Sequence, residues 1–238
     1  GDKRMKNGKL YGVSVGPGDP ELLTLKAKRL IEACGVIATP QTSGEKTLAL
    51  DIVMGIVDLS HKQILRLPFM MTRDEEQLRV SHEEQAKQIC AYLKRGEDVA
   101  LLNLGDVSVY STYSYMNDLV LAAGYETEMI PGVTSFCAIA AILGQSLTVM
   151  KKPLHIIPAG YGKLSEYLQL PGTKVIMKTG KNLTEVKDTL SKLDLLDCAS
   201  LVADCGLPGQ KVYPSIKDAG NDEGYFATII VKERQNGF

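Results

Sequence analysis

The sequence predicts an α/β protein built from two α/β domains. Strand-like apolar runs alternate with helical segments in the first half, and three strand-like runs follow closely near the end. A stretch with threonine, lysines and proline, Leu147–Pro153, resembles a linker between them. We expect an N-terminal domain over residues 5–149, with a mostly parallel sheet and helices on both faces. A C-terminal domain over residues 150–238 is expected to hold a mixed sheet with antiparallel strands.

In the first domain, short apolar runs indicate strands, and apolar residues at helical intervals indicate helices. The expected strands are Leu10–Val15, Gly35–Thr39, Ile64–Leu67, Asp98–Asn103 and Glu126–Ile130. The expected helices are Glu21–Ala33, Glu45–Ile56, Gln77–Lys94, Ser111–Ala123 and Ser135–Leu143.

The second domain begins with the same alternation and ends differently. Its expected helices are Lys163–Leu170 and Asn182–Leu193. Its expected strands are Leu154–Pro158, Lys174–Lys178, Ala199–Asp204, Lys211–Ser215 and Tyr225–Lys232. The last three strands follow one another without an intervening helix, so we expect antiparallel pairing among them.

Composition excludes several function classes. Hydrophobic residues make up 45% and charged residues 23% of the 238 residues, with a net charge of −1, so we expect neither a nucleic-acid-binding surface nor disorder. No apolar run reaches the roughly 20 residues of a membrane span. Gly1–Lys9 is polar and basic, without the apolar run of a signal peptide behind it, which predicts a cytoplasmic protein. The five cysteines lack CxxC spacing and the three histidines are scattered, so no protein-bound metal is expected.

The first candidate site is the glycine-rich turn Gly16-Pro17-Gly18-Asp19-Pro20, which follows a strand and opens a helix. Glycine permits a tight turn and a close approach of the backbone to a ligand. Neither the phosphate-binding loop GxxxxGK[ST] nor the dinucleotide fingerprint GxGxxG is present, which disfavours a nucleotide-binding protein. A plain strand-to-helix turn, with Asp19 or Thr24 near the helix start, stays equally open on this segment alone.

Two further turns follow strands in the same way. Leu104-Gly105-Asp106 comes after the strand that ends at Asn103, and Ser111 or Thr112 is placed to cap the next helix. Pro131-Gly132-Val133-Thr134-Ser135 follows the strand ending at Ile130. Carboxyl ends of parallel strands meet at one sheet edge, so the three turns together predict a small-molecule site there.

The three turns together resemble the tetrapyrrole methylase family, which binds S-adenosylmethionine between two α/β domains. The resemblance covers nearly the whole chain and is carried by Leu10–Ala27, Leu104–Thr112 and Ile130–Phe136, and more faintly by Val175–Met177, Val202–Gln210 and Tyr225–Val231. Local features resemble the branch that methylates C20 of precorrin-2 or its cobalt form: Thr39-Pro40, Leu67–Met70, Tyr110–Tyr115, Pro131–Phe136 and Tyr225-Phe226. Ser14 and Val107 depart from the family pattern, where glycine and proline are common.

The resemblance implies a cofactor site, a substrate and a fold. S-adenosylmethionine is the implied methyl donor, and a tetrapyrrole with several carboxylates is the implied substrate. The resemblance also implies the tetrapyrrole methylase fold and a homodimer. The implied cofactor-binding residues are Pro17, Leu104, Gly105, Asp106, Val109, Thr134, Ser135, Met177, Ala203 and Ala227. Lysines and arginines are candidates for binding substrate carboxylates: Lys46, Arg66, Arg73, Lys151 and Lys152.

The catalytic expectation is proton removal from the methylated carbon. Asp106 is the first candidate base, with Tyr110 or Tyr113 as an orienting group. The alternative, in which Asp106 only binds the cofactor and water takes the proton, stays open. So do methylation of another precorrin position, of ribosomal RNA or of a modified histidine, and a non-catalytic tetrapyrrole carrier.

Overall fold

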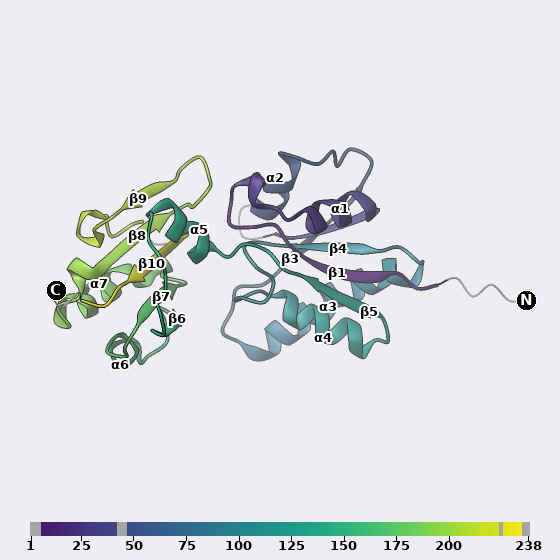
Figure 1. Cartoon of the computed structure of the whole chain (residues 1–238). Helices are drawn as coiled ribbons and strands as arrows, with labels where there is room; N and C mark the ends of the chain where they lie inside the picture. Colours follow the sequence, from purple (N-terminus) through teal and green to yellow (C-terminus); the bar gives the residue numbers. More distant parts are fainter. Residues whose placement is uncertain (1–5, 42–46, 224–225, 235–238) are drawn as a thin grey trace, which may run out of the picture. The chain divides into compact units, whose positions relative to one another are not determined.

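The computed structural model describes residues 6–41, 47–223 and 226–234. The chain forms two compact units, the first ending at Thr134 and the second beginning at Ser135. Each unit contains one five-stranded sheet (Figure 1). The predicted α/β class with two sheets is confirmed.

The sheet of the first unit is entirely parallel, in the order β3-β2-β4-β1-β5. This order places β1 between β4 and β5. Its strands are β1 (Lys9–Ser14), β2 (Val36–Gln41), β3 (Gln63–Pro68), β4 (Val99–Asn103) and β5 (Glu126–Ile130). The predicted parallel sheet is therefore confirmed, and each predicted strand lies within two residues of the observed one.

Helices cover both faces of this sheet (Figure 1). Successive strand residues point to opposite faces, so Leu102 packs with α1 and α2 while Leu101 packs with α3 and α4. Burial on both faces explains why β4 reads as a continuous apolar run. The helices are α1 (Leu25–Ala33), α2 (Leu48–Met54), α3 (Glu75–Lys94) and α4 (Tyr113–Ala122).

The predicted helix Glu21–Ala33 is divided in the structure. A 3-10 turn, η1 (Pro20–Leu22), precedes α1, because Thr24 adopts an extended backbone and its hydroxyl accepts the Ala27 N–H at 3.0 Å. The prediction of one continuous helix was wrong, and Thr24, expected near the helix start, is the N-cap of α1. The start of the predicted helix Glu45–Ile56 lies outside the described residues.

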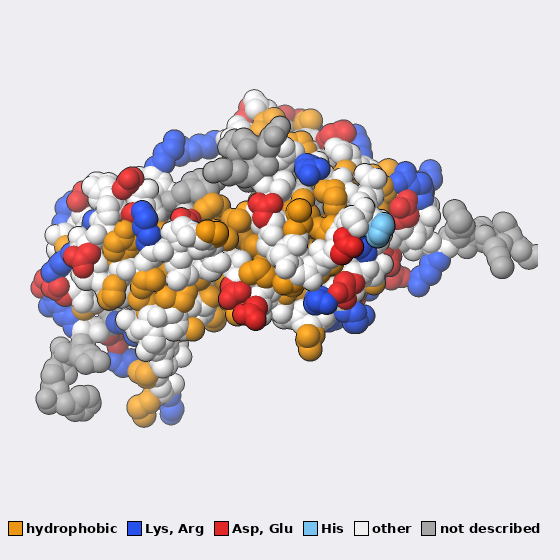
Figure 2. Space-filling model, turned by 90° about the horizontal axis from the view of Figure 1, so that it is seen from above, with side chains coloured by type: hydrophobic (Ala, Val, Ile, Leu, Met, Phe, Trp, Pro, Cys, Tyr) orange, Lys and Arg blue, Asp and Glu red, His pale blue; other side chains and the backbone are white. Residues whose placement is uncertain are grey.

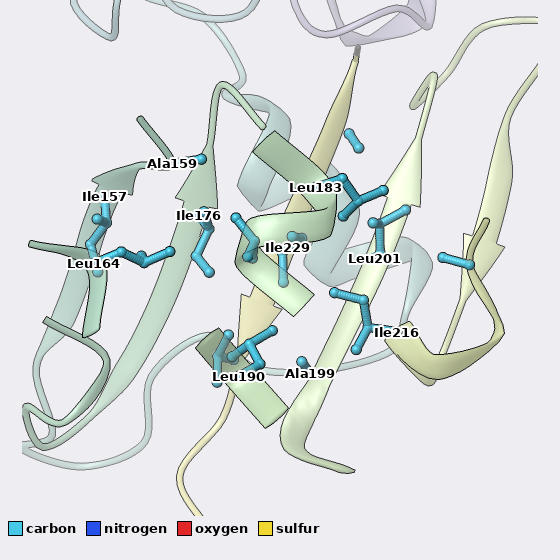
Figure 3. Close-up of a cluster of buried hydrophobic side chains, with 14 of the residues drawn as sticks. Ile157, Ala159, Leu164, Ile176, Leu183, Leu190, Ala199, Leu201, Ile216 and Ile229 are labelled. Carbon is cyan, nitrogen blue, oxygen red and sulfur yellow. The ribbon is translucent and has the colours of Figure 1, made fainter. Parts of the chain in front are cut away.

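The second unit holds a mixed sheet, in the order β6-β7-β10-β8-β9. Only β6 and β7 run parallel, and the other neighbours are antiparallel, as predicted. Its strands are β6 (Leu154–Pro158), β7 (Thr173–Met177), β8 (Ala199–Ala203), β9 (Lys211–Tyr213) and β10 (Ala227–Val231). Its longer helices are α5 (Ser135–Ile142), α6 (Leu164–Leu168) and α7 (Leu183–Lys192). Figure 3 shows the core that α6 and α7 form with one face of the sheet, including Leu190, Leu201 and Ile229.

The division between the units lies before the predicted boundary at 149/150. Helix α5 packs against β10 of the second sheet, and the Lys232 ammonium, just beyond β10, donates to the carbonyls of Ser146 and Leu147. The segment predicted as a linker is thus attached to the second unit. The sequence pattern missed this because the alternation of strand and helix continues through α5 without a change in composition.

Candidate functional site

The carboxyl ends of β4, β1 and β5 lie side by side. Ser14 pairs with Asn103, and Val13 pairs with Ile130, so the three strands end at the same level. The glycine turns that follow them therefore meet at one edge of the first sheet. The convergence predicted from three separate motifs is confirmed.

The first two turns are joined by their main chains. The Gly16 N–H donates to the Gly105 carbonyl at 3.2 Å, and the Gly105 N–H donates back to Gly16 at 2.8 Å. Both residues lie in the left-handed region, with φ of 77° and 66°, which favours glycine. A Cβ on Gly105 would meet no atom within 4 Å, so the turn faces open space. A flat ligand could approach its backbone there.

Asp106 links the second turn to the third. Its Oδ2 accepts the Gly132 N–H at 2.8 Å, and its Oδ1 accepts both the N–H of Ser108, at 2.8 Å, and the Ser108 hydroxyl. Burial alone would raise the pKa of Asp106, but the bonds from Ser108 and Gly132 outweigh it and hold the pKa below the ordinary 3.8. The carboxylate is thereby stabilised as an anion, which weakens it as a base.

Ser14 supplies another link between the same two turns. Its buried hydroxyl donates to the Ile130 carbonyl at 2.7 Å and accepts the Val107 N–H at 2.8 Å. Sequence reasoning treated Ser14 and Val107 only as departures from the family pattern. The two residues are 93 positions apart, and nothing in the sequence pattern indicates that they form a hydrogen bond.

The two candidate orienting tyrosines occupy different environments. Tyr110 is 44% exposed, has a φ of 49°, and its pKa is raised by partial burial. Tyr113 is fully buried, its ring packs where a side chain on Gly12 would lie, and burial raises its pKa to about 12. Its hydroxyl donates to the Glu128 carbonyl at 3.4 Å, so Tyr113 is a residue of the buried core and not of the site surface.

Four further cofactor candidates of the first unit lie in these turns or next to them. Pro17 is buried, Leu104 and Val109 are half-buried, and Thr134 is half-buried at the end of the first unit. Ser135, the next residue, is the first residue of α5 and of the second unit. Thr112 is the N-cap residue of α4 but makes no capping bond with its side chain, and the hydroxyl of the preceding Ser111 accepts the Tyr113 N–H at 3.1 Å.

The other three candidates of the second unit lie together at one edge of its sheet. Met177 ends β7, Ala203 ends β8, and Ala227 begins the antiparallel β10 opposite Ala203. Ala203 and Ala227 are buried, and the Thr179 hydroxyl donates to the Ala227 carbonyl at 3.0 Å. The structure thus brings together residues that are 50 positions apart in the sequence.

The candidate basic residues for substrate binding lie on the surface. Arg66, Arg73 and Lys151 are exposed, Lys152 pairs with Glu233, and Lys46 lies outside the described residues. Figure 2 shows basic and acidic side chains interspersed over the visible face.

Metal-binding clusters and membrane-spanning helices are both absent from the described residues. Within the described ranges, no group of three or more His, Cys, Asp or Glu side chains is arranged to hold a metal ion. Likewise, none of the helices that the structure describes has the length and apolar character of a membrane span.

The close approach of Gly132 to Ser14 generates a first prediction. A Cβ on Gly132 would lie 2.4 Å from the Ser14 Cβ and 3.0 Å from the Gly105 carbonyl oxygen. We expect Gly132→Ala to destabilise the protein by about 1–3 kcal/mol, as overpacking does. Urea unfolding measures this. The matched control is Gly35→Ala, where a Cβ meets nothing within 4 Å and no comparable loss is expected. Equal stability of the two variants would contradict the contact.

The lowered pKa of Asp106 generates a pH prediction. Because its folded pKa lies below 3.8, the charged carboxylate adds stability above that pH and loses it as the pH falls through the folded value. The difference in unfolding free energy between the wild type and Asp106→Asn should be constant at neutral pH and shrink in acid. Urea unfolding of both proteins across the pH range tests this, and a difference that grows in acid would refute it.

Comparison with known proteins identifies the family. Residues 9–219 match the Tetrapyrrole (Corrin/Porphyrin) Methylases. The cobalt-precorrin-2 C(20)-methyltransferase of Salmonella typhimurium is 30% identical, over 96% of this chain and 98% of the relative. The probable cobalt-precorrin-2 C(20)-methyltransferase of Methanocaldococcus jannaschii is 37% identical, over 78% of each chain.

A solved structure supports the fold. Uroporphyrin-III C-methyl transferase from Thermus thermophilus, complexed with S-adenyl homocysteine, superposes with a TM-score of 0.70 at 21% identity, covering 95% of this chain and 92% of that one. Family match, relatives and fold agree, and the chain belongs to the tetrapyrrole (corrin/porphyrin) methylase family.

Proposed function

We propose that the protein transfers a methyl group from S-adenosylmethionine to C20 of a precorrin-2-type tetrapyrrole, with or without cobalt, in cobalamin biosynthesis. The observation that carries this proposal is the meeting of three glycine turns at the edge formed by β4, β1 and β5. The family match and the names of the two relatives support the reaction and the substrate.

The residues at this edge fit the cofactor. The open space in front of Gly105 allows a flat ring to approach the backbone, and the half-buried side chains of Leu104 and Val109 offer apolar contact. We propose that these residues bind the cofactor with Pro17, Asp106, Thr134 and Ser135, and that Met177, Ala203 and Ala227 of the second unit add contacts to it.

The bound cofactor would supply a methyl group already activated by its sulfonium. The task of the protein is then to orient donor and acceptor, which is worth up to roughly 7–11 kcal/mol. Asp106 with its lowered pKa is better suited to holding the turns and the cofactor than to removing a proton. Tyr110, which is partly exposed beside the second turn, is proposed as the orienting group.

The broader setting is also proposed. We infer a cytoplasmic homodimer that needs no protein-bound metal, nucleic acid or membrane, from the family resemblance and the balanced charge of the chain. Any cobalt would enter within the tetrapyrrole substrate.

Activity is tested directly. Incubation with S-adenosylmethionine and either precorrin-2 or cobalt-precorrin-2 should yield a product heavier by one methylene, about 14 Da, by mass spectrometry. A carbon-13-labelled methyl donor and NMR would locate the new group at C20. Methylation at another carbon would favour another precorrin position. Tetrapyrrole binding without cofactor binding in calorimetry would instead identify a carrier.

The role of Asp106 is tested by two substitutions. Asp106→Ala should weaken S-adenosylmethionine binding about 10- to 100-fold, the effect of losing a charge-assisted hydrogen bond. If Asp106 were also the base, Asp106→Asn would keep much of the affinity and slow single turnovers strongly. We expect the affinity and the rate to fall together instead. Wild-type behaviour of both variants would exclude Asp106 from the site.

A further inference from the structure

The hydroxyl of Ser14 joins the chain segments that lead into the second and third turns. Ser14 is the last residue of β1 and only 1% exposed. Its Oγ donates to the carbonyl of Ile130, the last residue of β5, and accepts the N–H of Val107, in the turn after β4. One side chain on the central strand therefore joins the chain segments that leave both neighbouring strands.

Packing leaves this hydroxyl little freedom. The Ser14 Cβ lies against the main chain of Gly132, where a second Cβ would approach to 2.4 Å. Both hydrogen bonds are buried, so water cannot readily replace a lost partner. The position of the Val107 amide is therefore determined by β1.

Val107 lies in the same turn as two of the proposed cofactor-binding residues, so fixing its amide also restricts their positions. It is the second residue of a turn in which the Val109 N–H donates to the Asp106 carbonyl at 3.1 Å. Its side chain is buried in the core that faces α3 and α4. The N–H that Ser14 binds thus lies between Asp106 and Val109, two residues proposed to contact the cofactor.

We propose that Ser14 is a positioning residue for the methyl donor. Its hydroxyl fixes the position of the Leu104–Val109 segment relative to the Pro131–Thr134 turn. This inference rests on the proposed function and deepens it. Ser14 acts through the turns, and its bonding capacity is used within the protein by Ile130 and Val107.

The test compares two substitutions of Ser14. Ser14→Ala removes the hydroxyl that accepts the Val107 N–H, and Ser14→Cys keeps the shape of the side chain while its sulfur accepts a hydrogen bond only weakly. Calorimetry with S-adenosylmethionine should give a dissociation constant raised about 5- to 30-fold in Ser14→Ala, the effect of one buried hydrogen bond, and a smaller rise in Ser14→Cys.

A purely structural role would give a different result. It would lower the melting temperature and the fraction of binding-competent protein, seen as reduced stoichiometry, while the dissociation constant of the folded molecules stayed at the wild-type value. The matched control is Thr189→Ala, which removes a hydroxyl that donates to the Glu185 carbonyl on the surface of α7. It should change neither quantity.

Each outcome decides the proposal. An unchanged dissociation constant in Ser14→Ala would overturn it. If Ser14→Ala does not fold, Ser14→Cys decides alone, and an unchanged dissociation constant in that variant would overturn the proposal in the same way. Failure of the wild type to bind S-adenosylmethionine would refute the proposed function instead. Hydrogen exchange then still reports the bond itself: the Val107 amide should lose protection in Ser14→Ala, and unchanged protection would disprove the link.

Discussion

The main-chain pairing between Gly16 and Gly105 is the constraint on which the candidate site depends. It extends the contact of β1 with β4 beyond the strand ends, so the turns that follow these two strands are hydrogen-bonded to each other. Both glycines have a left-handed backbone there, which most residues adopt only with strain. Because Gly105 is held in this way, Asp106 comes next to the Gly132 amide, and the third turn joins the other two.

The sheet gives this pairing its precision. β4 is buried along its whole length, with helices packed on both faces, so a slip by one residue would move its side chains between two differently shaped cores. The register that aligns Ser14 with Asn103 is therefore strongly determined. A rigid parallel sheet with functional groups on the turns at its carboxyl edge is the arrangement from which α/β proteins build ligand sites.

Local pattern predicted much of this fold. The strands and their order along the chain follow from apolar runs, and the meeting of the glycine turns follows from parallel pairing. What failed depends on contacts through space. The assignment of α5 to the second unit rests on its packing against β10, and the burial of Tyr113 rests on the space beside Gly12. The division of the first helix could have been foreseen, because Thr24 is a good cap and Pro20 favours a separate turn.

The electrostatics of Asp106 bear on the kind of catalysis this edge can support. A carboxylate that accepts hydrogen bonds from Gly132 and from both donors of Ser108 has a low proton affinity, and base strength falls with the pKa. The same bonds hold two turns at a defined separation, and the Ser14 hydroxyl constrains them a second time. Methyl transfer from a sulfonium needs orientation more than it needs a strong base. Most polar groups of this site hydrogen-bond to its own backbone and fix the positions of the turns. Such a site is suited to methyl transfer, because it would accelerate the reaction by orienting the donor and the acceptor.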